Sequence, residues 1–437
     1  MEKDCYQEII AEVSKKLAEK FISEEKNLAK RATLIDGDIA DIIQEIGEKT
    51  TKKVLENTRD KIVVKKKQEG LTIHRNPIVT FVTVFGRLQI FSPYLWRHSE
   101  SSKPLKDEMG ITHQGRSEAV KRALSDFGIE DSFALAAKRF REHYRFDIGV
   151  STVDRSTKET ARQAVEYMEK KLSGDDREKA SIDKMLVELD GCEIRTAKLT
   201  PAENSSETTP VYGNPKKEKE IKWRDVRIGF VRPLDCLSKV FVGKMDSYPV
   251  IVGQLYQAAE YVGMTSRTEI VGVSDGGIGL PEELQRQFPT MQFILDKSHL
   301  KDHLYDTAEK MGLPKADRAR WVNPRVSAIS NGDVEKVLEE LEEEYKQNSN
   351  DRLKRLIGYI NRFYDAIDYS SFKSKGYPIG SGEIESAHKS IPQKRLKIPG
   401  ASWHPDSIDP MLALRILRAD DWWEDFWNQR TEKLLAA

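Results

Sequence analysis

The chain lacks three features that would each define a class of protein: clustered cysteines, long apolar runs and an excess of charge of one sign. Cys5, Cys192 and Cys236 are scattered over 437 residues, which excludes a disulfide framework or a zinc ribbon. No run approaches the roughly 20 apolar residues that span a bilayer, and no signal-peptide pattern is found, so we expect a soluble, cytoplasmic protein without a membrane partner. Basic and acidic residues number 71 each, so any nucleic-acid surface must come from local segregation of charge.

Residues 1–66 form the first segment that the pattern defines. Charged residues alternate with apolar positions such as Ile9, Val13, Leu17 and Phe21, a spacing that puts one apolar stripe on a helix. We expect an N-terminal helical arm used for packing or dimerisation.

Residues 67–180 combine a hairpin with three helices. Two β-rich runs in 78–91 flank a central Gly86 and predict a β-hairpin; amphipathic helices follow near 116–127 and 131–144. A third helix opens near Ser151, a natural N-cap. Two short helices and a third with polar residues at its start are typical of a helix-turn-helix that binds DNA, although any three-helix bundle shares this pattern. The candidate DNA-binding residues here are Ser151, Thr152, Arg155 and Lys158.

Residues 181–300 change to short β-rich runs, which we place at 185–190, 223–231, 237–242, 269–275 and 291–296, with a long polar surface loop over 198–219. Three consecutive strands, then helix, strand, helix and strand predict an α/β fold with a mixed sheet and helices on its faces. This is the order of an RNase H-like catalytic domain. Residues 301–376 predict a helical insertion, and 377–437 a second part of the catalytic domain with a C-terminal tail.

Three carboxylates are candidates for metal chemistry. Asp190 and Asp275 each end an apolar strand and are followed by glycine, which would let the chain turn and leave the carboxylate at the sheet edge. Glu385 falls in the first turn of a helix that Gly380-Ser381-Gly382 would open. Magnesium prefers such hard oxygen ligands, and two ions about 3.5–4 Å apart can stabilise the attacking and leaving oxygens of a phosphodiester.

Four motifs in this order make the chain similar to a known family. They are Leu189-Asp-Gly191, Ser274-Asp-Gly-Gly277, Asp296-Lys-Ser-His299 and Pro378-Ile-Gly-Ser-Gly-x-x-Glu385. The chain resembles, over about residues 70 to 430, the DDE transposases of bacterial insertion sequences, and most of all the ISKra group.

This resemblance implies that Asp190, Asp275 and Glu385 are the catalytic residues and hold two Mg²⁺ or Mn²⁺ ions. It favours Glu385 over the rival Glu383, and it implies that Asp296 and His299 help to position DNA. The implied partners are double-stranded DNA at the terminal inverted repeats of an element and target DNA, bound by a homo-oligomer. A nuclease or resolvase of the same fold, or a domesticated DNA-binding protein without transposition activity, remain the alternatives.

A run of cations beside Glu385 is where the segregated charge is expected. Such side chains could neutralise phosphates without specifying sequence. The DNA-binding candidates here are His388, Lys389, Lys394, Arg395 and Lys397.

Overall fold

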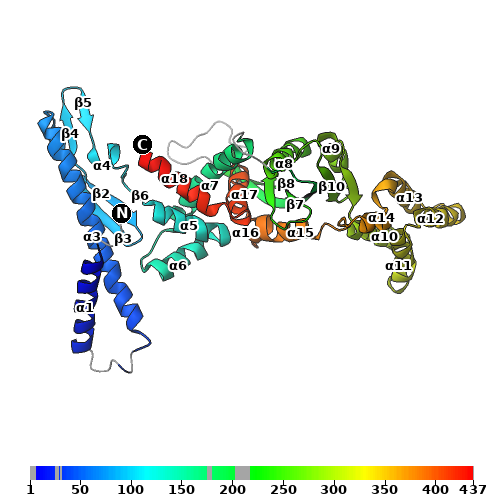
Figure 1. Cartoon of the computed structure of the whole chain (residues 1–437), viewed down its shortest axis with the longest axis horizontal. Coiled ribbons are helices and arrows are strands. Elements are labelled where there is room, and N and C mark those ends of the chain that lie inside the picture. The colour runs from blue at the N-terminus through cyan, green and yellow to red at the C-terminus, as the bar shows by residue number, and fades with distance from the viewer. Residues whose placement is uncertain (1–5, 25–28, 30–31, 175–179, 202–216, 437) are drawn as a thin grey trace. The chain divides into compact units, whose positions relative to one another are not determined.

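The computed structural model describes residues 6–24, 29, 32–174, 180–201 and 217–436. The chain divides into two compact units, residues 1–123 with 137–148, and residues 124–136 with 149–437. Figure 1 shows the elements of both units. No helix within the described ranges is long and apolar enough to cross a bilayer.

The N-terminal arm is helical, as its periodicity predicted. It consists of α1 (Gln7–Glu24) and the long α3 (Ile35–Gln68). The apolar stripe of α1 is exposed at Ile9 and Val13, whose side chains are 57% and 39% accessible. A role of this stripe in self-association stays a prediction.

The first unit also holds two small sheets. The predicted hairpin is confirmed: β2 (Ile78–Thr83) pairs antiparallel with β3 (Gly86–Phe91), and Gly86 takes the positive φ of 140° at the turn. Leu88 and Ile90 of β3 are fully buried, because alternate residues of a strand face the same side. The remaining elements are β1 (Thr72–Arg75), β4 (Tyr94–Arg97), β5 (Glu100–Ser102), α4 (Pro104–Asp107) and β6 (Gly115–Arg116).

The three helices expected after the hairpin are present as α5 (Glu118–Glu130), α6 (Phe133–Tyr144) and α7 (Val150–Ser173). The predicted N-cap at Ser151 is wrong. Gly149 has the extended backbone of the cap residue, so Ser151 already lies inside the first turn and its hydroxyl caps nothing. A helix-turn-helix function stays a prediction.

The second unit contains the expected mixed sheet, with strand order β11-β10-β7-β8-β9. The strands β7, β8 and β9 form an antiparallel meander, while β10 and β11 run parallel to β7. Their bounds are β7 (Lys184–Pro201), β8 (Lys217–Pro233), β9 (Val240–Lys244), β10 (Glu269–Ser274) and β11 (Gln292–Leu295). The loop predicted over 198–219 is wrong at both ends, which are strand, and its middle lies outside the described residues.

Helices cover both faces of this sheet. Val187 and Leu189 of β7 pack against α8 (Tyr248–Val262) and α9 (Leu280–Gln287). Leu186 and Ile194, which alternate with them, belong to the core on the other face, together with α7 and α17 (Ile408–Ala419). This alternation decides which side chains of β7 can meet the candidate site.

The segment after β11 is helical, as expected for 301–376. Figure 1 shows these helices as a group that follows the sheet. They are α10 (Lys297–Lys310), α11 (Lys315–Asn331), α12 (Val334–Asn348), α13 (Asp351–Arg362), η2 (Tyr364–Ala366) and α14 (Tyr369–Ser374). The chain then forms α15 (Gly382–His388), the π-helical turn η3 (Lys389–Gln393), α16 (Lys394–Leu396), η4 (Pro405–Ser407), α17 and α18 (Trp423–Ala436).

Candidate active site

Asp190 does not end its strand. The pairing of β7 with β8 continues without interruption through Asp190↔Ile228 and Gly191↔Arg227, so the glycine makes no turn and the expectation of a strand end here is wrong. The Asp190 carboxylate accepts the amide of Gly191 on Oδ1 at 2.7 Å, and its side chain is 29% exposed. Asp190 therefore projects from a continuous strand and is partly open to solvent.

Asp275 directly follows β10, as predicted. Its Oδ1 accepts the amide of Gly277 at 3.1 Å, which closes a tight turn at the end of the strand. The last registered pair of β10 and β7 is Val273↔Glu188, and Asp275 and Asp190 each lie two residues further on. Because side chains two residues apart on a strand point to the same face, Asp190 shares the face of Glu188, while Asp275 lies in the turn that follows the neighbouring strand.

Glu385 lies in the first turn of α15, where the sequence placed it, and its side chain is exposed. The carboxylate of the rival Glu383 already forms ion pairs with two cations. It receives Arg232 on both oxygens, at 2.7 and 3.2 Å, and Lys239 at 2.8 Å. The two cations lower the pKa of Glu383 against the opposing effect of its burial, which raises it. Of the two glutamates, only Glu385 has its carboxylate free of such an ion pair.

Asp296 is a capping residue, and its expected role in positioning DNA stays a prediction. It is the N-cap of α10 and accepts the amide of His299 at 2.8 Å. Its other oxygen accepts the Ser381 hydroxyl at 2.7 Å and the Ser381 amide. With 1% of its surface exposed, Asp296 fixes the chain just before α15. His299 is half-buried, and its role at DNA stays a prediction.

Glu188 is a polar residue of this site that the sequence reasoning missed. It is fully buried, and its Oε2 accepts the amide of Ile384 in α15 at 3.0 Å, while Oε1 has no hydrogen-bond partner. Burial raises the pKa of Glu188 to about 8. The sequence could have indicated this residue, because Glu188 is an acidic residue between Val187 and Leu189 in an apolar run, on the same face of the strand as Asp190.

His388 lies inside the protein, so its predicted contact with DNA is wrong. It is 2% exposed and ends α15, one turn after Glu385. Its Nε2 lies 3.8 Å from Oδ2 of Asp190, and neither ring nitrogen has a hydrogen-bond partner. Burial lowers the pKa of His388, an effect that the neighbouring Asp190 opposes. The imidazole is therefore held as a neutral side chain beside Asp190.

Arg395 is also structural, and its predicted role on DNA is wrong. Only 3% of it is exposed, its Nε donates to the carbonyl of Gly128 at 2.8 Å, and its guanidinium lies 4.6 Å from the ring centres of both Phe133 and Trp403. Burial lowers the pKa of Arg395 to about 10. This side chain holds the end of α5 rather than a phosphate.

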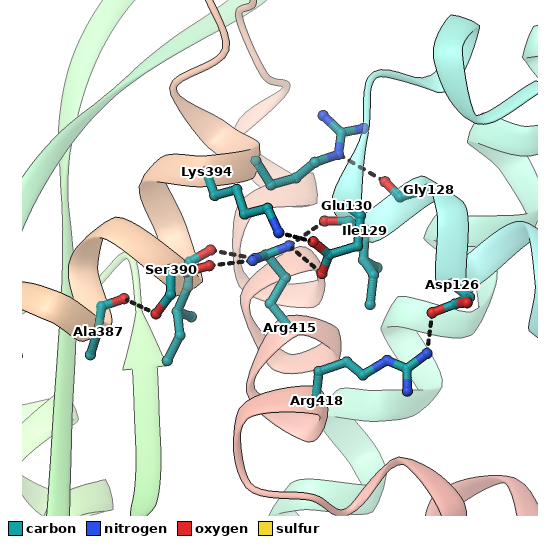
Figure 2. A network of polar contacts seen from close by, with 11 residues as sticks. Asp126, Gly128, Ile129, Glu130, Ala387, Ser390, Lys394, Arg415 and Arg418 are labelled. Carbon is teal, nitrogen blue, oxygen red and sulfur yellow. Dashed lines mark hydrogen bonds and ion pairs between the residues drawn. The ribbon is translucent and has the colours of Figure 1, made fainter. Parts of the chain in front are cut away.

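The other lysines of the predicted basic surface differ in their surroundings. Lys394 forms an ion pair with Glu130 at the end of α5, as Figure 2 shows, but Glu130 also pairs with Arg415, so one carboxylate faces two cations. Lys389 and Lys397 are exposed. The run of cations therefore leaves these two lysines for phosphate contacts, and their DNA binding stays a prediction.

Arg415 joins three segments close to α15. Figure 2 shows its guanidinium between the end of α5 and the π-helical turn η3. It donates to the carbonyls of Ile129, Ser390 and Ile391, and pairs with Glu130 at 3.2 Å. A π-helical turn leaves carbonyls without their usual α-helical donors, and Arg415 supplies two of them. The turn that follows Glu385 and His388 is thereby fixed to α17 and α5.

The predicted DNA-binding residues at the start of α7 keep part of their accessibility. Ser151 and Arg155 are exposed, whereas Thr152 and Lys158 are half-buried. Lys158 forms an ion pair with Asp154 at 2.8 Å, which reduces its value as a free cation. Contacts between DNA and these four residues stay a prediction.

The Asp275 turn faces another buried polar atom. The hydroxyl of Tyr359 in α13 has no hydrogen-bond partner, and a Cβ added at Gly276 would lie 2.6 Å from it. Burial raises the pKa of Tyr359, so the hydroxyl keeps its proton. Only glycine at position 276 allows this approach of the hydroxyl to the turn.

The predicted convergence of Asp190, Asp275 and Glu385 is not seen. Among the described residues, no three His, Cys, Asp or Glu side chains lie close enough together to hold a metal ion. The structure places Asp190 within β7, Asp275 just after the neighbouring strand β10, and His388 beside Asp190. A metal-binding role of the three carboxylates stays a prediction.

Comparisons with known proteins add little. No family model matches the chain, and no curated protein matches it. Among solved structures, the Drosophila P element transposase strand transfer complex is similar with a TM-score of 0.35 and 10% sequence identity, over 72% of this chain and 94% of that one. A likeness this distant carries no argument about the activity of this chain.

Proposed function

We propose that this protein is a DNA transposase of the DDE type, with Asp190, Asp275 and Glu385 as its catalytic carboxylates. One observation carries the proposal: Asp190 and Asp275 each lie two residues beyond the last registered pair of two neighbouring parallel strands of a mixed sheet, Asp190 within its strand and Asp275 in the turn after its own. The order β11-β10-β7-β8-β9 and the helical segment after β11 support an RNase H-like domain with a helical insertion. The motif resemblance supplies the assignment of the third carboxylate.

The carboxylate oxygens of Asp190 and Asp275 are of the kind that Mg²⁺ or Mn²⁺ prefers, and Glu385 would have to move to join them, since the three do not converge in this structure. Oδ1 of Asp190 and of Asp275 each accepts one backbone amide, and within the described part of the chain neither Oδ2 accepts a hydrogen bond. The nearby imidazole of His388 and hydroxyl of Tyr359 are buried and unpaired, as expected beside a site that gains ligands or water.

Asp190, Asp275 and Glu385 would hold the ions, which when bound would act as Lewis acids on the phosphodiester. In the first reaction a water oxygen bonds to phosphorus while the bond to the 3′-oxygen breaks, so the element end leaves as a 3′-hydroxyl. In the second reaction that 3′-oxygen bonds to phosphorus of the target strand, whose own 3′-oxygen leaves. Lys389 and Lys397 are the exposed cations placed to neutralise phosphates near α15.

The test is cleavage and strand transfer on duplex DNA that carries the sequences on both sides of this gene, with Mg²⁺ or Mn²⁺ and a supercoiled plasmid as target. We expect Asp190→Asn and Asp275→Asn to lower the cleavage rate by about 10³-fold or more, since losing a ligand removes several kcal/mol of charge stabilisation. Glu385→Gln should act in the same direction. Glu193→Gln, an exposed acid on the same strand, is the matched control.

Full activity in Asp190→Asn or Asp275→Asn would contradict the proposal. Loss of activity in Glu383→Gln with full activity in Glu385→Gln would overturn the choice of the third carboxylate. Cleavage with no joined product would assign a nuclease instead, and binding to the DNA ends with no cleavage would assign a DNA-binding protein.

A further inference from the structure

The His388 side chain poses a problem that the fold by itself does not explain. It is 2% exposed, and both ring nitrogens lack a hydrogen-bond partner. A buried polar group without a partner costs free energy, and an apolar side chain of similar volume would avoid that cost. Such a group is retained where another state of the molecule gives it a partner.

The charged atom nearest to the imidazole indicates the partner that His388 would gain. Nε2 of His388 lies 3.8 Å from Oδ2 of Asp190, the oxygen that the Gly191 amide does not bind. A movement of a few tenths of an ångström to one ångström would bring the pair within hydrogen-bond distance. The carboxylate would then be held on both oxygens, by Gly191 from its own strand and by His388 from α15.

The place of His388 in the chain links it to Glu385 as well. The two residues are three apart on α15, so they lie on neighbouring positions of one helical face. The start of this helix is fixed to β7 by the Glu188–Ile384 hydrogen bond, and the turn after it by Arg415. The imidazole is thus carried by a helix whose two ends are attached to the body of the fold.

We propose that His388 is a positioning residue for Asp190: its imidazole donates Nε2–H to Oδ2 and orients the carboxylate toward the reacting phosphodiester and its metal ions. This rests on the proposed function of Asp190 as a ligand. Partners that orient a ligand from behind are worth roughly 10–100-fold in metal affinity or activity. The amide of a glutamine at 388 can also donate to Oδ2, whereas a leucine cannot.

The experiment compares His388→Leu, His388→Gln and the wild-type protein in three measurements: the melting temperature without metal, Mn²⁺ binding by calorimetry, and the cleavage rate. We expect His388→Leu to melt at the wild-type temperature or above it, because it removes an unpaired buried polar group, yet to bind Mn²⁺ and cleave about 10–100-fold less well. His388→Gln should recover most of both losses. His404→Leu is the control for loss of an imidazole away from Asp190: it removes the side-chain cap of η4 and can lower the melting temperature, but it should leave Mn²⁺ binding and cleavage unchanged.

Each outcome of these measurements supports or contradicts the proposed role of His388. A His388→Leu protein that binds Mn²⁺ as tightly as wild type, or that melts far below it, would assign His388 a packing role only and overturn the proposal. A failure of His388→Gln to recover binding would overturn it too, as would wild-type protein that binds no Mn²⁺. Wild-type protein that binds Mn²⁺ but cleaves no DNA overturns the proposed function alone.

Discussion

Two neighbouring regions of the second unit differ in how their central buried polar groups are paired. At the junction of α5, η3 and α17, the buried Arg415 finds an acceptor for each of its three guanidinium nitrogens. Around Asp190 and Asp275, polar atoms are buried without partners: Oε1 of Glu188, both nitrogens of His388 and the hydroxyl of Tyr359. From sequence alone, the basic run of the junction suggested a functional surface, whereas the strands that carry the two aspartates are mostly apolar.

This difference distinguishes charged groups that stabilise the fold from polar groups that remain available to bind a ligand. Burial of a cation says little about function when its partners are in place, because such groups stabilise the local structure. Unpaired atoms are the exception in folded proteins, and four of those among the described residues lie beside the two candidate catalytic carboxylates, while others, such as Nη2 of Arg395, lie elsewhere. The comparison can be tested by substituting charged residues of α17 and measuring the change in the free energy of unfolding.

The largest effect is expected at Arg415. Arg415→Leu leaves the carbonyls of Ile129, Ser390 and Ile391 without their donor, so we expect the free energy of unfolding to fall by about 3–5 kcal/mol. Denaturant unfolding followed by circular dichroism measures it. Arg415→Lys keeps the charge but not the planar fork, and should recover only part of the loss.

If Arg415→Leu is as stable as the wild type, the stability of the junction of α5, η3 and α17 does not depend on the paired guanidinium. The difference that we describe between this junction and the surroundings of Asp190 is then wrong. If instead both Arg415→Leu and His388→Leu destabilise the protein by similar amounts, the two regions do not differ in kind.

An intermediate effect is expected at Asp420, the acid at the end of α17 whose two oxygens receive only the amide of Phe241, at 3.1 and 3.2 Å. Burial raises the pKa of Asp420 well above its usual value. The folded state therefore holds a proton that the unfolded chain releases near pH 4, and stability falls as pH rises from there through the raised pKa.

Asp420→Asn should remove this part of the pH dependence. We expect the variant to be more stable than wild type at pH 7, by about 1.4 kcal/mol for each unit by which the pKa is raised, and nearly equal at pH 4. Thermal unfolding at both pH values measures the gap. A gap that is constant across pH would show that Asp420 titrates normally and that the packed region contains no under-satisfied acid.

The smallest effect is expected at Arg418. Its ion pair with Asp126 joins α17 to α5 as Arg415 does, but both partners are 39% exposed (Figure 2). Solvent and salt screen such a pair, so Arg418→Gln should cost only about 0.2–1 kcal/mol, and less at high salt. A loss as large as that of Arg415→Leu would mean that the contact between these helices matters more than burial of the cation.

Local patterns predicted much of the fold. The hairpin around Gly86, the helices that became α5 and α6, the mixed sheet and the helices after β11 all follow from periodicity and turn residues along short stretches. Glu385 was placed in the first turn of a helix for the same reason. These features depend on residues that are close together in the sequence, so one sequence is enough to predict them.

What the sequence did not display is pairing over long distances. The continuation of β7 through Gly191 depends on β8, and a lone Asp-Gly pair is the same in a strand and in a turn. Lys394 and Arg395 resemble a solvated basic run until Glu130 and Gly128, more than 260 positions away, are placed beside them. His388 could not be told from a surface cation, because its burial comes from the packing of α15 on the sheet.

The unbroken β7 has a consequence for how such chains can vary in length. Up to Glu188 the strand is registered by β10 on one side and β8 on the other, whereas further on it pairs with β8 and, on its other edge, only through the bridge between Thr196 and Trp403 in the described part of the chain. One residue inserted in this outer ribbon would turn Ile194 and Thr196 from the core to the solvent, but two would restore their facing. Insertions and deletions should therefore be tolerated best in even steps beyond Thr196, where they leave the bridge to Trp403 and the register of Asp190 untouched.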